Sequence, residues 1–241
     1  MAMKNILAFG DSLTWGFIAG TWERHPFDTR WPNVLAAGLH DKARVIEEGH
    51  NGRTTVFDDH VLAAGLHGKA RVIEEGHNGR TTVFDDPTTV DDRNGARILP
   101  VLLSTHQPLD LVIILLGTND IKFANRCRAF DASMGMGRLV QIIQTFPYQA
   151  WAPKPQVLIV APPALVHTDD EWFNDLWGHA IEESKLFGKH YARVAEEMGV
   201  HFFDAGAVAK ADKTDGGHLD AANTKAIGTA LVPVVKGILE L

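Results

Sequence analysis

Five short runs of apolar residues, separated by stretches with helical periodicity, constrain the fold of this chain more than any other feature. The runs cover residues 5–9, 43–46, 109–116, 156–160 and 200–203, and residues 70–73 repeat the second run. Continuous apolar runs of this length are typical of strands buried on both faces. Helices are predicted over residues 32–39, 95–103, 132–145, 171–198 and 221–239. This alternation predicts an α/β fold: a flavodoxin-like, doubly wound parallel five-stranded sheet with helices on both faces.

Residues 33–59 and 60–86 are tandem copies of one 27-residue unit and differ only at Asn33/His60 and Asp41/Gly68. Repeat architectures need about three or more units that stack on one another, so two copies indicate an insertion. A helix followed by a returning strand brings the two ends of each copy close together. One copy can therefore be accommodated as an inserted loop at the surface. We therefore predict a single domain over residues 1–241 that contains this duplication.

Charge and composition exclude several classes of partner. The chain has 30 acidic and 23 basic residues, and its net charge of −7 offers no basic field for nucleic acid or anionic lipid. Its apolar runs are far shorter than the ~20 residues that cross a bilayer, and the N-terminus lacks the cleavage site of a signal peptide. The single cysteine, Cys127, cannot form an internal disulfide. These features predict a cytoplasmic protein without nucleic-acid or membrane partners.

Polar residues that follow the strands are the candidates for function, because ligands of such sheets bind beyond the carboxyl ends of the strands. Residues 10–13, Gly-Asp-Ser-Leu, come directly after the first run. A glycine at this turn allows a tight bend that exposes the Ser12 hydroxyl and directs backbone N–H groups toward an oxyanion. Taken alone, however, such a triplet is more often a helix cap.

Two further segments reach the same edge of the predicted sheet. Asn119 follows the strand at residues 109–116 and can donate its carboxamide to the crevice, although an Asx turn is an equal alternative. Asp215 and His218 precede the last helix, and their three-residue spacing can place a carboxylate against one imidazole nitrogen. The alternative there is a polar, glycine-rich turn. Together with Ser12, these residues indicate nucleophilic catalysis because the fold brings all of them to one edge.

Four sequence blocks in order resemble those of the SGNH (GDSL) hydrolase family. They are residues 10–13, residues 51–53 or 78–80, residues 117–120 and residues 215–218. The similarity covers nearly the whole chain, except one copy of the repeat, and is greatest to bacterial arylesterases and acyltransferase/perhydrolases. The resemblance implies the SGNH hydrolase fold and a serine esterase that cleaves short-chain, acetyl-type esters through an acyl-enzyme. It also implies possible transfer of the acyl group to alcohols or peroxide, and a homo-oligomer.

The resemblance implies a role for each member of a catalytic triad. Ser12 is the expected nucleophile, His218 is the expected base, and Asp215 is the carboxylate that orients His218. A serine hydroxyl is too weakly acidic to attack an ester unaided, whereas a neutral imidazole can accept its proton. Asp11 and Trp15 are expected to line the substrate pocket, with Trp15 narrowing the acyl side; a packed core aromatic is the alternative for Trp15.

The expected oxyanion hole combines the Ser12 N–H, the N–H of Gly52 or Gly79, and the side-chain amide of Asn119. The two glycines occupy equivalent positions in the two copies. We favour Gly79 because the loop after it runs into residues 87–95, whereas the loop after Gly52 runs into a duplicated helix.

No metal or cofactor is expected, because the twelve histidines show no metal-ligand spacing. The adjacent glutamates at residues 47–48 and 74–75 are expected at a solvated strand edge with one inward carboxylate. Tryptophans 151, 172 and 177 are candidates for either a subunit interface or the core. Two other functions stay open: a flavodoxin-like binding module, and an inactive or structural relative in which the duplication disrupts the oxyanion loop.

Overall fold

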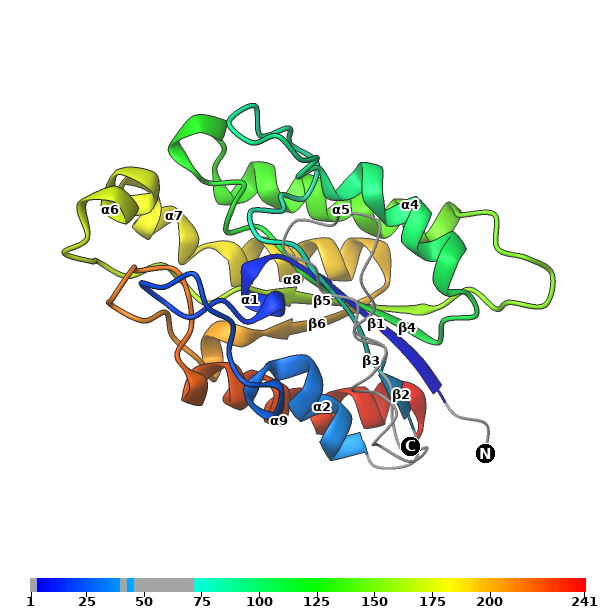
Figure 1. The fold of residues 1–241 in the computed structure, drawn as a ribbon. Helices are drawn as coiled ribbons and strands as arrows, with labels where there is room; N and C mark the ends of the chain where they lie inside the picture. The colour runs from blue at the N-terminus through cyan, green and yellow to red at the C-terminus, as the bar shows by residue number, and fades with distance from the viewer. Residues whose placement is uncertain (1–3, 40–42, 46–71) are drawn as a thin grey trace.

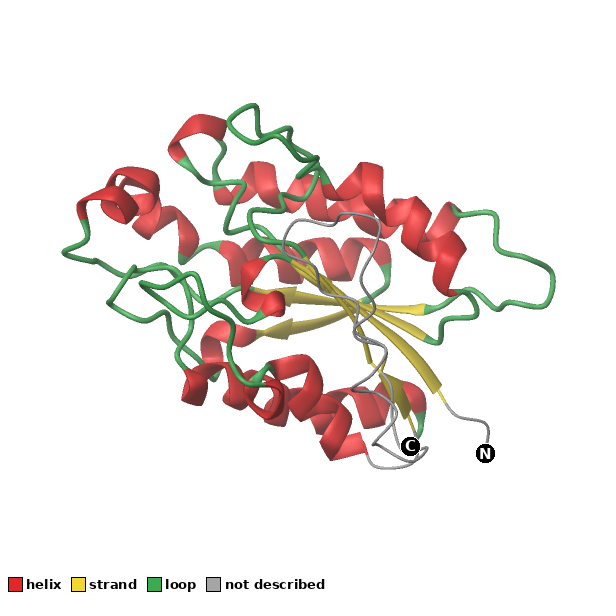
Figure 2. Cartoon of the chain, viewed as in Figure 1, coloured by secondary structure: helices red, strands yellow, loops and turns green. Residues whose placement is uncertain are grey.

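The computed structural model describes residues 4–39, 43–45 and 72–241. Within this part of the chain, five strands form one parallel sheet in the order β2-β1-β4-β5-β6 (Figures 1 and 2). The strands are β1 (Lys4–Gly10), β2 (Ala43–Val45), β4 (Leu111–Leu115), β5 (Gln156–Ala161) and β6 (His201–Asp204). This confirms the predicted five-stranded, doubly wound parallel sheet.

Helices cover both faces of the sheet (Figure 1). On one face lie α2 (Trp31–Leu39) and α9 (Ala221–Leu239), and on the other lie α4 (Gly95–His106), α5 (Ala129–Thr145) and α8 (Phe187–Met198). Alternate residues of β1 enter the two cores: Ile6 packs with α2 and α9, whereas Leu7 packs with α4, α5 and α8. Both faces of the strand are therefore buried, which is why its sequence is continuously apolar.

The prediction of one long helix over residues 171–198 is wrong. The chain instead forms α6 (Glu171–Trp177), η3 (Gly178–Ala180), α7 (Ile181–Ser184) and α8. The buried Ser184 hydroxyl accepts the Leu165 N–H at 2.9 Å and donates to the Ile181 carbonyl at 2.6 Å. Such side-chain bonds to the backbone compete with a continuous helix. The short elements that remain are α1 (Ser12–Trp15), η1 (Phe27–Thr29), η2 (Phe123–Asn125) and η4 (Ala205–Ala207).

The two copies of the repeat contribute different parts of one structural unit. The first copy supplies most of α2 and all of β2, and the second supplies β3 (Val72–Gly76) and the turn after it. β2 pairs with the first half of β1, with Val45 opposite Ile6. β3 lies along β1, and the His77 N–H after it donates to the Gly10 carbonyl at 3.1 Å. A strand that ran directly from residue 45 into residue 73 would keep this register.

We predict that deletion of residues 46–72 leaves a 214-residue chain with the same fold. Of the deleted residues the structure describes only Val72, and Val45 is its equivalent in the first copy. The midpoint of thermal unfolding, measured by circular dichroism, should stay within about 4 °C, the shift that ~1 kcal/mol produces in a chain of this size.

Deletion of residues 34–60 provides a matched control. Its product has the same length and differs only in carrying Gly68 where the first product carries Asp41. The two products should therefore unfold alike. If both products are insoluble, or unfold at a temperature far below that of the full-length chain, two copies of the repeat are needed for stability and the prediction is wrong.

Candidate active site

Ser12 is the first residue of α1, a single helical turn that follows β1 directly. The Asp11 carboxylate caps this turn by accepting the Leu13 N–H at 2.9 Å. The turn ends at Gly16, which has a φ of 87°, a conformation that favours glycine. A side chain at Gly10 would come within 2.9 Å of the Leu115 carbonyl, so only glycine fits between β1 and β4. These constraints place Ser12 at the carboxyl edge of the sheet.

The structure brings Ser12, His218 and Asp215 together in one hydrogen-bonded series. Ser12 Oγ lies 2.9 Å from His218 Nε2, and His218 Nδ1 lies 2.7 Å from Asp215 Oδ2. The other carboxylate oxygen, Asp215 Oδ1, accepts the backbone N–H groups of Gly217 and His218 at 3.1 and 2.9 Å. All three side chains of the series are buried. The carboxylate is therefore fixed by its own turn before it orients the imidazole.

The electrostatics of this series suit proton transfer from Ser12 to His218. Burial alone would raise the pKa of Asp215, but the hydrogen bond and charge of His218 and the two backbone N–H groups hold it below its usual value. Asp215 is therefore ionised at neutral pH and stabilises a positive charge on His218. A hydroxyl, an imidazole and a carboxylate in this order can carry out nucleophilic acyl transfer.

The turn beside the Ser12 helix comes from the second copy of the repeat. A side chain at Gly76 would lie 2.3 Å from the Trp15 backbone nitrogen, so β3 and α1 touch backbone to backbone. Gly79 follows with a φ of 82°. The Asn119 amide nitrogen donates to the Arg80 carbonyl at 3.1 Å, which ties this turn to the loop after β4. The other candidate glycine, Gly52, lies outside the described residues.

Asn119 also contacts the turn that carries Ser12. Its amide nitrogen donates to Asp11 Oδ2 at 3.2 Å as well as to the Arg80 carbonyl, so both amide hydrogens have acceptors. Burial raises the pKa of Asp11 to about 6. An oxyanion bound at Asn119 would take the place of one of these two acceptors. Asp11, predicted to line the pocket, thus lies buried against Leu13 and Asn119.

A second buried carboxylate, Asp120, anchors the loop that follows Gly79. The Thr82 N–H donates to Asp120 Oδ2 at 3.0 Å, and the Thr82 hydroxyl also donates to this carboxylate. Burial, with a smaller effect of the nearby Asp11 carboxylate, raises the pKa of Asp120 to about 7. Arg80 Nη1 donates to the Gly10 carbonyl at 2.9 Å. The segment around Gly79 is therefore held from the β1 side and from the β4 side.

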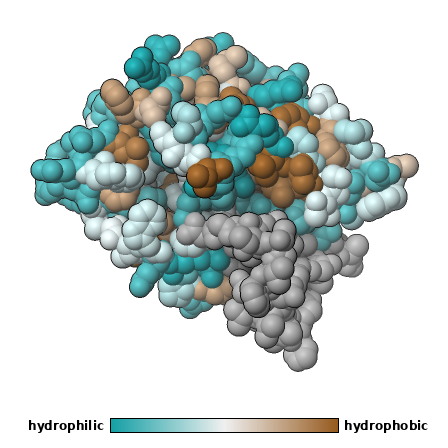
Figure 3. Space-filling view, turned by 45° about the horizontal axis from the view of Figure 1, so that its top comes forward, coloured by the Kyte–Doolittle hydropathy of each residue, from teal (hydrophilic) through white to brown (hydrophobic). Residues whose placement is uncertain are grey.

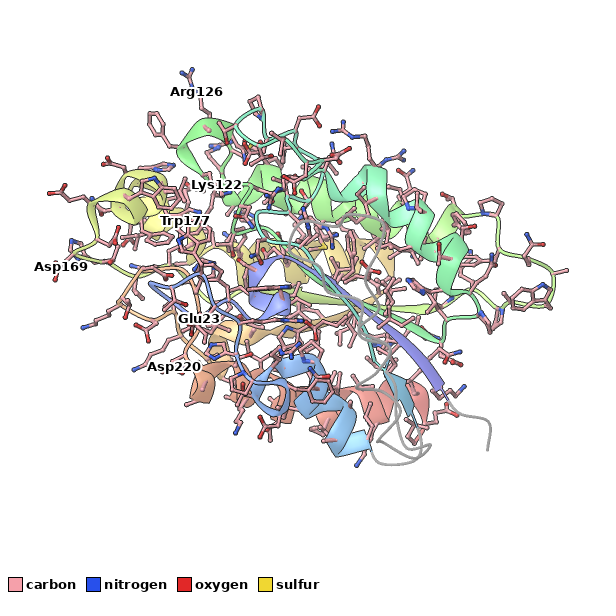
Figure 4. The ribbon with its side chains drawn as sticks, in the orientation of Figure 1. Glu23, Lys122, Arg126, Asp169, Trp177 and Asp220 are labelled. Atoms are coloured by element: carbon pink, nitrogen blue, oxygen red, sulfur yellow. The ribbon has the colours of Figure 1, made fainter. Side chains whose placement is uncertain are left out.

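Three aromatic rings surround His218, and the sequence reasoning missed their role. The ring centroids of Phe17, Phe173 and Trp177 lie 4.3, 6.1 and 5.8 Å from the imidazole centroid. Trp177, labelled in Figure 4, is buried and donates its ring N–H to the Thr118 carbonyl at 3.2 Å. Trp151 and Trp172 are 64% and 63% exposed. Phe17 follows the Gly16 turn directly, but no sequence signal links it to Phe173.

Trp15, the other predicted pocket residue, is buried at the end of α1, the helical turn that begins with Ser12. Its ring lies 5.2 Å from the Arg24 guanidinium carbon and 6.3 Å from the Phe17 ring. Its carbonyl accepts a hydrogen bond from Arg24 Nε at 2.6 Å. Trp15 therefore packs next to Phe17, which itself covers one face of His218.

The expected solvated edge with one inward carboxylate is wrong at residues 74–75, because both Glu74 and Glu75 are buried, at 0% and 7% exposed. Glu74 pairs with Arg24 and, at 3.4 Å, with Arg30. The amide of Asn33 also donates to Glu74, at 3.3 Å. Burial is possible because these partners compensate the charge. The equivalent glutamates at residues 47–48 lie outside the described residues.

A separate hollow of about 460 Å³ contains none of the predicted site residues. Phe84, Arg126, Cys127 and Met134 contribute to its lining, and Figure 4 labels Arg126. Burial raises the pKa of the Cys127 thiol to about 11, so this cysteine stays protonated and is a poor nucleophile. Figure 3 brings the α4–α5 side forward and shows a mostly polar surface with separate apolar patches.

Two features are absent from residues 4–39, 43–45 and 72–241. No group of three or more histidine, cysteine, aspartate or glutamate side chains there could hold a metal ion. In the same part of the chain, no helix is both long and apolar enough to span a membrane.

A family sequence profile matches residues 57–224 and is that of the GDSL-like Lipase/Acylhydrolase family. The chain belongs to this family. The match includes the second-copy turn at Gly79, Asn119 and the pair Asp215 and His218, but it begins after Ser12 and after Gly52. None of the curated protein sequences matches the chain.

Solved structures similar to this GDSL hydrolase span its whole length. A carbohydrate acetylesterase family member from Sinorhizobium meliloti is 39% identical with a TM-score of 0.86, covering 99% of this chain and 100% of that one. A protein assigned as an arylesterase from Agrobacterium tumefaciens is 47% identical, with a TM-score of 0.82 and coverage of 98% and 100%. The aryl esterase of M. smegmatis is 38% identical, with a TM-score of 0.83 and the same coverage.

Replacing each of the two equivalent glycines by valine should show which copy builds the turn. Gly79→Val should cost about 1–3 kcal/mol of unfolding free energy, because a positive φ strains a β-branched residue. Its Cβ would also lie 2.6 Å from Arg93 Nη1. Gly52→Val, in identical local sequence, should cost less. Urea unfolding of both variants measures this difference, and equal small losses would reject the assignment of the turn to Gly79.

Proposed function

We propose that this chain is a serine esterase that hydrolyses short-chain, acetyl-type carboxylic esters through an acyl-enzyme. The observation that carries the proposal is the buried hydrogen-bonded series from Ser12 through His218 to Asp215. Membership of the GDSL-like Lipase/Acylhydrolase family supports ester cleavage as the reaction class. The similar solved structures described as a carbohydrate acetylesterase family member and an aryl esterase support short acyl groups.

In the proposed reaction, Ser12 Oγ attacks the ester carbonyl while His218 Nε2 takes the serine proton. The ionised Asp215 stabilises the imidazolium that results. The carbonyl oxygen becomes an oxyanion and is bound by the backbone N–H groups of Ser12 and Gly79 and by the Asn119 amide. His218 then gives its proton to the leaving alcohol, and the acetyl group stays on Ser12. A water molecule, activated by His218, releases the acid and restores the enzyme.

We further propose that alcohols or peroxide compete with water for the acyl-enzyme. Phe17, Phe173 and Trp177 place apolar surface around His218, where the second acceptor must bind. Apolar surroundings lower the local density of water and favour a less polar acceptor. Asp11 and Trp15, packed behind the nucleophile turn, would limit the acyl side of the pocket to short chains.

The proposal also covers the location, the oligomeric state and the domain organisation of the protein. We propose a cytoplasmic homo-oligomer in which each subunit is a single domain with one extra copy of the repeat. The exposed rings of Trp151 and Trp172 support a subunit interface, since interfaces are enriched in aromatic residues. The single cysteine supports a reducing compartment.

An inactive relative with a disrupted oxyanion loop is the less favoured function. In the described residues, the turn at Gly79 is tied to Asn119 through the Arg80 carbonyl and to β1 through Arg80 Nη1. A flavodoxin-like binding module would not need Ser12 and His218 within hydrogen-bond distance. The activity of the wild-type chain toward a short ester separates these functions.

Ser12→Ala should abolish turnover of p-nitrophenyl acetate, with a loss of kcat of about 10⁴-fold or more, because the nucleophile is removed. A steady-state assay of p-nitrophenol release measures the loss. Ser133→Ala, which removes another buried serine far along the chain in α5, is the matched control and should keep wild-type kcat. Equal activity of Ser12→Ala and wild type would contradict the proposed function.

Asn119→Ala should lower kcat by about 10²- to 10³-fold with a smaller change in KM, because the amide acts on charge that develops in the transition state. The fold should persist, and far-ultraviolet circular dichroism checks this. Unchanged turnover in the folded variant would remove Asn119 from the oxyanion hole.

A further inference from the structure

The loop from Gly16 to Arg30, here the 16–30 loop, contacts the Asp215–His218 turn without belonging to any of the four sequence blocks. The Phe17 ring packs on the His218 imidazole with centroids 4.3 Å apart. The Gly20 N–H donates to Asp215 Oδ2 at 3.3 Å, the same oxygen that His218 contacts. Figure 4 shows Glu23 of this loop on the same side of the molecule as Asp220, which caps α9 just after the turn.

His25 of the 16–30 loop makes a further buried polar contact, with Leu219, the residue that follows this turn. The His25 side chain is only 6% exposed, and its Nε2 lies 2.9 Å from the Leu219 carbonyl. A carbonyl can only accept, so His25 Nε2 carries a hydrogen and donates it. The His25 backbone is itself held, because its N–H donates to the Gly16 carbonyl at 2.7 Å and its carbonyl accepts from Arg30 Nε at 3.0 Å.

Leu219 is the residue directly after His218, so its carbonyl belongs to the backbone that carries the imidazole. On the other side, the His218 carbonyl accepts the Asp212 N–H at 2.7 Å. Ile18 of the 16–30 loop forms a parallel bridge with Leu219, whose side chain is buried between the sheet and α9. Without His25, the buried Leu219 carbonyl would lose the side-chain donor that holds it, and the backbone at His218 would be free to shift.

The same loop is joined to the helix that carries Ser12. Arg24 Nε donates to the carbonyl of Trp15, the last residue of α1, at 2.6 Å. Arg24 and Arg30 both pair with the buried Glu74 of β3. One cluster of buried charges therefore holds the end of the nucleophile helix and the base of the loop that reaches Leu219. The relative position of Ser12 and His218 is set through this shared support.

We propose that His25 is a positioning residue for His218: it holds the Leu219 carbonyl and thereby keeps His218 Nε2 in line with Ser12 Oγ. The inference rests on the proposed esterase function. His25 has no contact with Ser12 or with the imidazole among its hydrogen bonds, and acts through the backbone. A shift of His218 changes proton transfer in the transition state more than it changes substrate binding, so the effect belongs to kcat.

The test compares His25→Gln with His25→Asn. A glutamine amide nitrogen lies near the position of the histidine Nε2 and can still donate to the Leu219 carbonyl, whereas an asparagine amide is too short. We expect His25→Gln to keep kcat within about 3-fold of wild type, and His25→Asn to lose about 10- to 100-fold with KM changed by less than about 3-fold. Equal kcat values for the two variants would overturn the proposal.

Thr29→Val is the control for a merely structural effect of changes in this loop. It removes the hydroxyl bond to the Pro26 carbonyl, in the same loop but away from the Asp215–His218 turn. Its thermal midpoint should fall as far as that of His25→Asn or farther, while kcat stays at the wild-type value. If Thr29→Val and His25→Asn lose kcat in proportion to their loss of stability, His25 has only a structural role.

A second measurement does not depend on turnover. The proton on His218 Nδ1, hydrogen-bonded to Asp215, should give a low-field nuclear magnetic resonance signal in wild type and in His25→Gln. In His25→Asn this signal should broaden or shift, and an unchanged signal would count against the proposal. If wild type shows the signal but cleaves no short ester, the proposed function fails while the positioning by His25 is still tested.

Discussion

The hydrogen bond between Ser12 and His218 joins residues that are 206 positions apart, and the rest of the structure serves to make this contact possible. Holding such distant groups together costs conformational entropy, which a single hydrogen bond does not offset. The two apolar cores on either side of the sheet supply the stabilisation. Because β1 ends at Gly10 and α9 begins beside the same edge, burial of these elements brings both side chains to one crevice.

Several carboxylates are buried around this contact, and two of them show how they are held. Glu74 is held by two arginines and an asparagine, and Asp120 by the N–H and hydroxyl of Thr82. Buried charges contribute little net stability, but removal of one partner is costly. Their contribution is to geometry, since a carboxylate bonded to several groups at once has few arrangements. The network therefore fixes the backbone segments that present Ser12 and His218.

Much of this architecture can be predicted from the sequence, and the predictions that were wrong have identifiable physical causes. The strands were found because burial on both faces leaves continuous apolar runs, as at residues 111–115. The prediction of one helix over residues 171–198 was wrong because the apolar periodicity of the sequence gives no sign of the hydrogen bonds that Ser184 makes with Leu165 and Ile181. The burial of both Glu74 and Glu75 was not predicted, because the arginine partners of Glu74 come from a loop 44 to 50 positions earlier and the histidine partner of Glu75 lies 31 positions later. Local pattern carries no information about such partners.

The sequence by itself determines three features of this protein, because each depends on local chemistry. They are the order of the four blocks, the alternation of strands and helices, and the identity of the reactive side chains. Which copy of the repeat lies beside Ser12 is not determined in this way, because the two copies have the same propensities at nearly every position. A three-dimensional contact assigns the turn at Gly79 to this place, because the Arg80 carbonyl accepts the Asn119 amide. The contact of His25 with the Leu219 carbonyl is likewise visible only in the folded chain. Those contacts join residues far apart in the chain, so packing alone selects them.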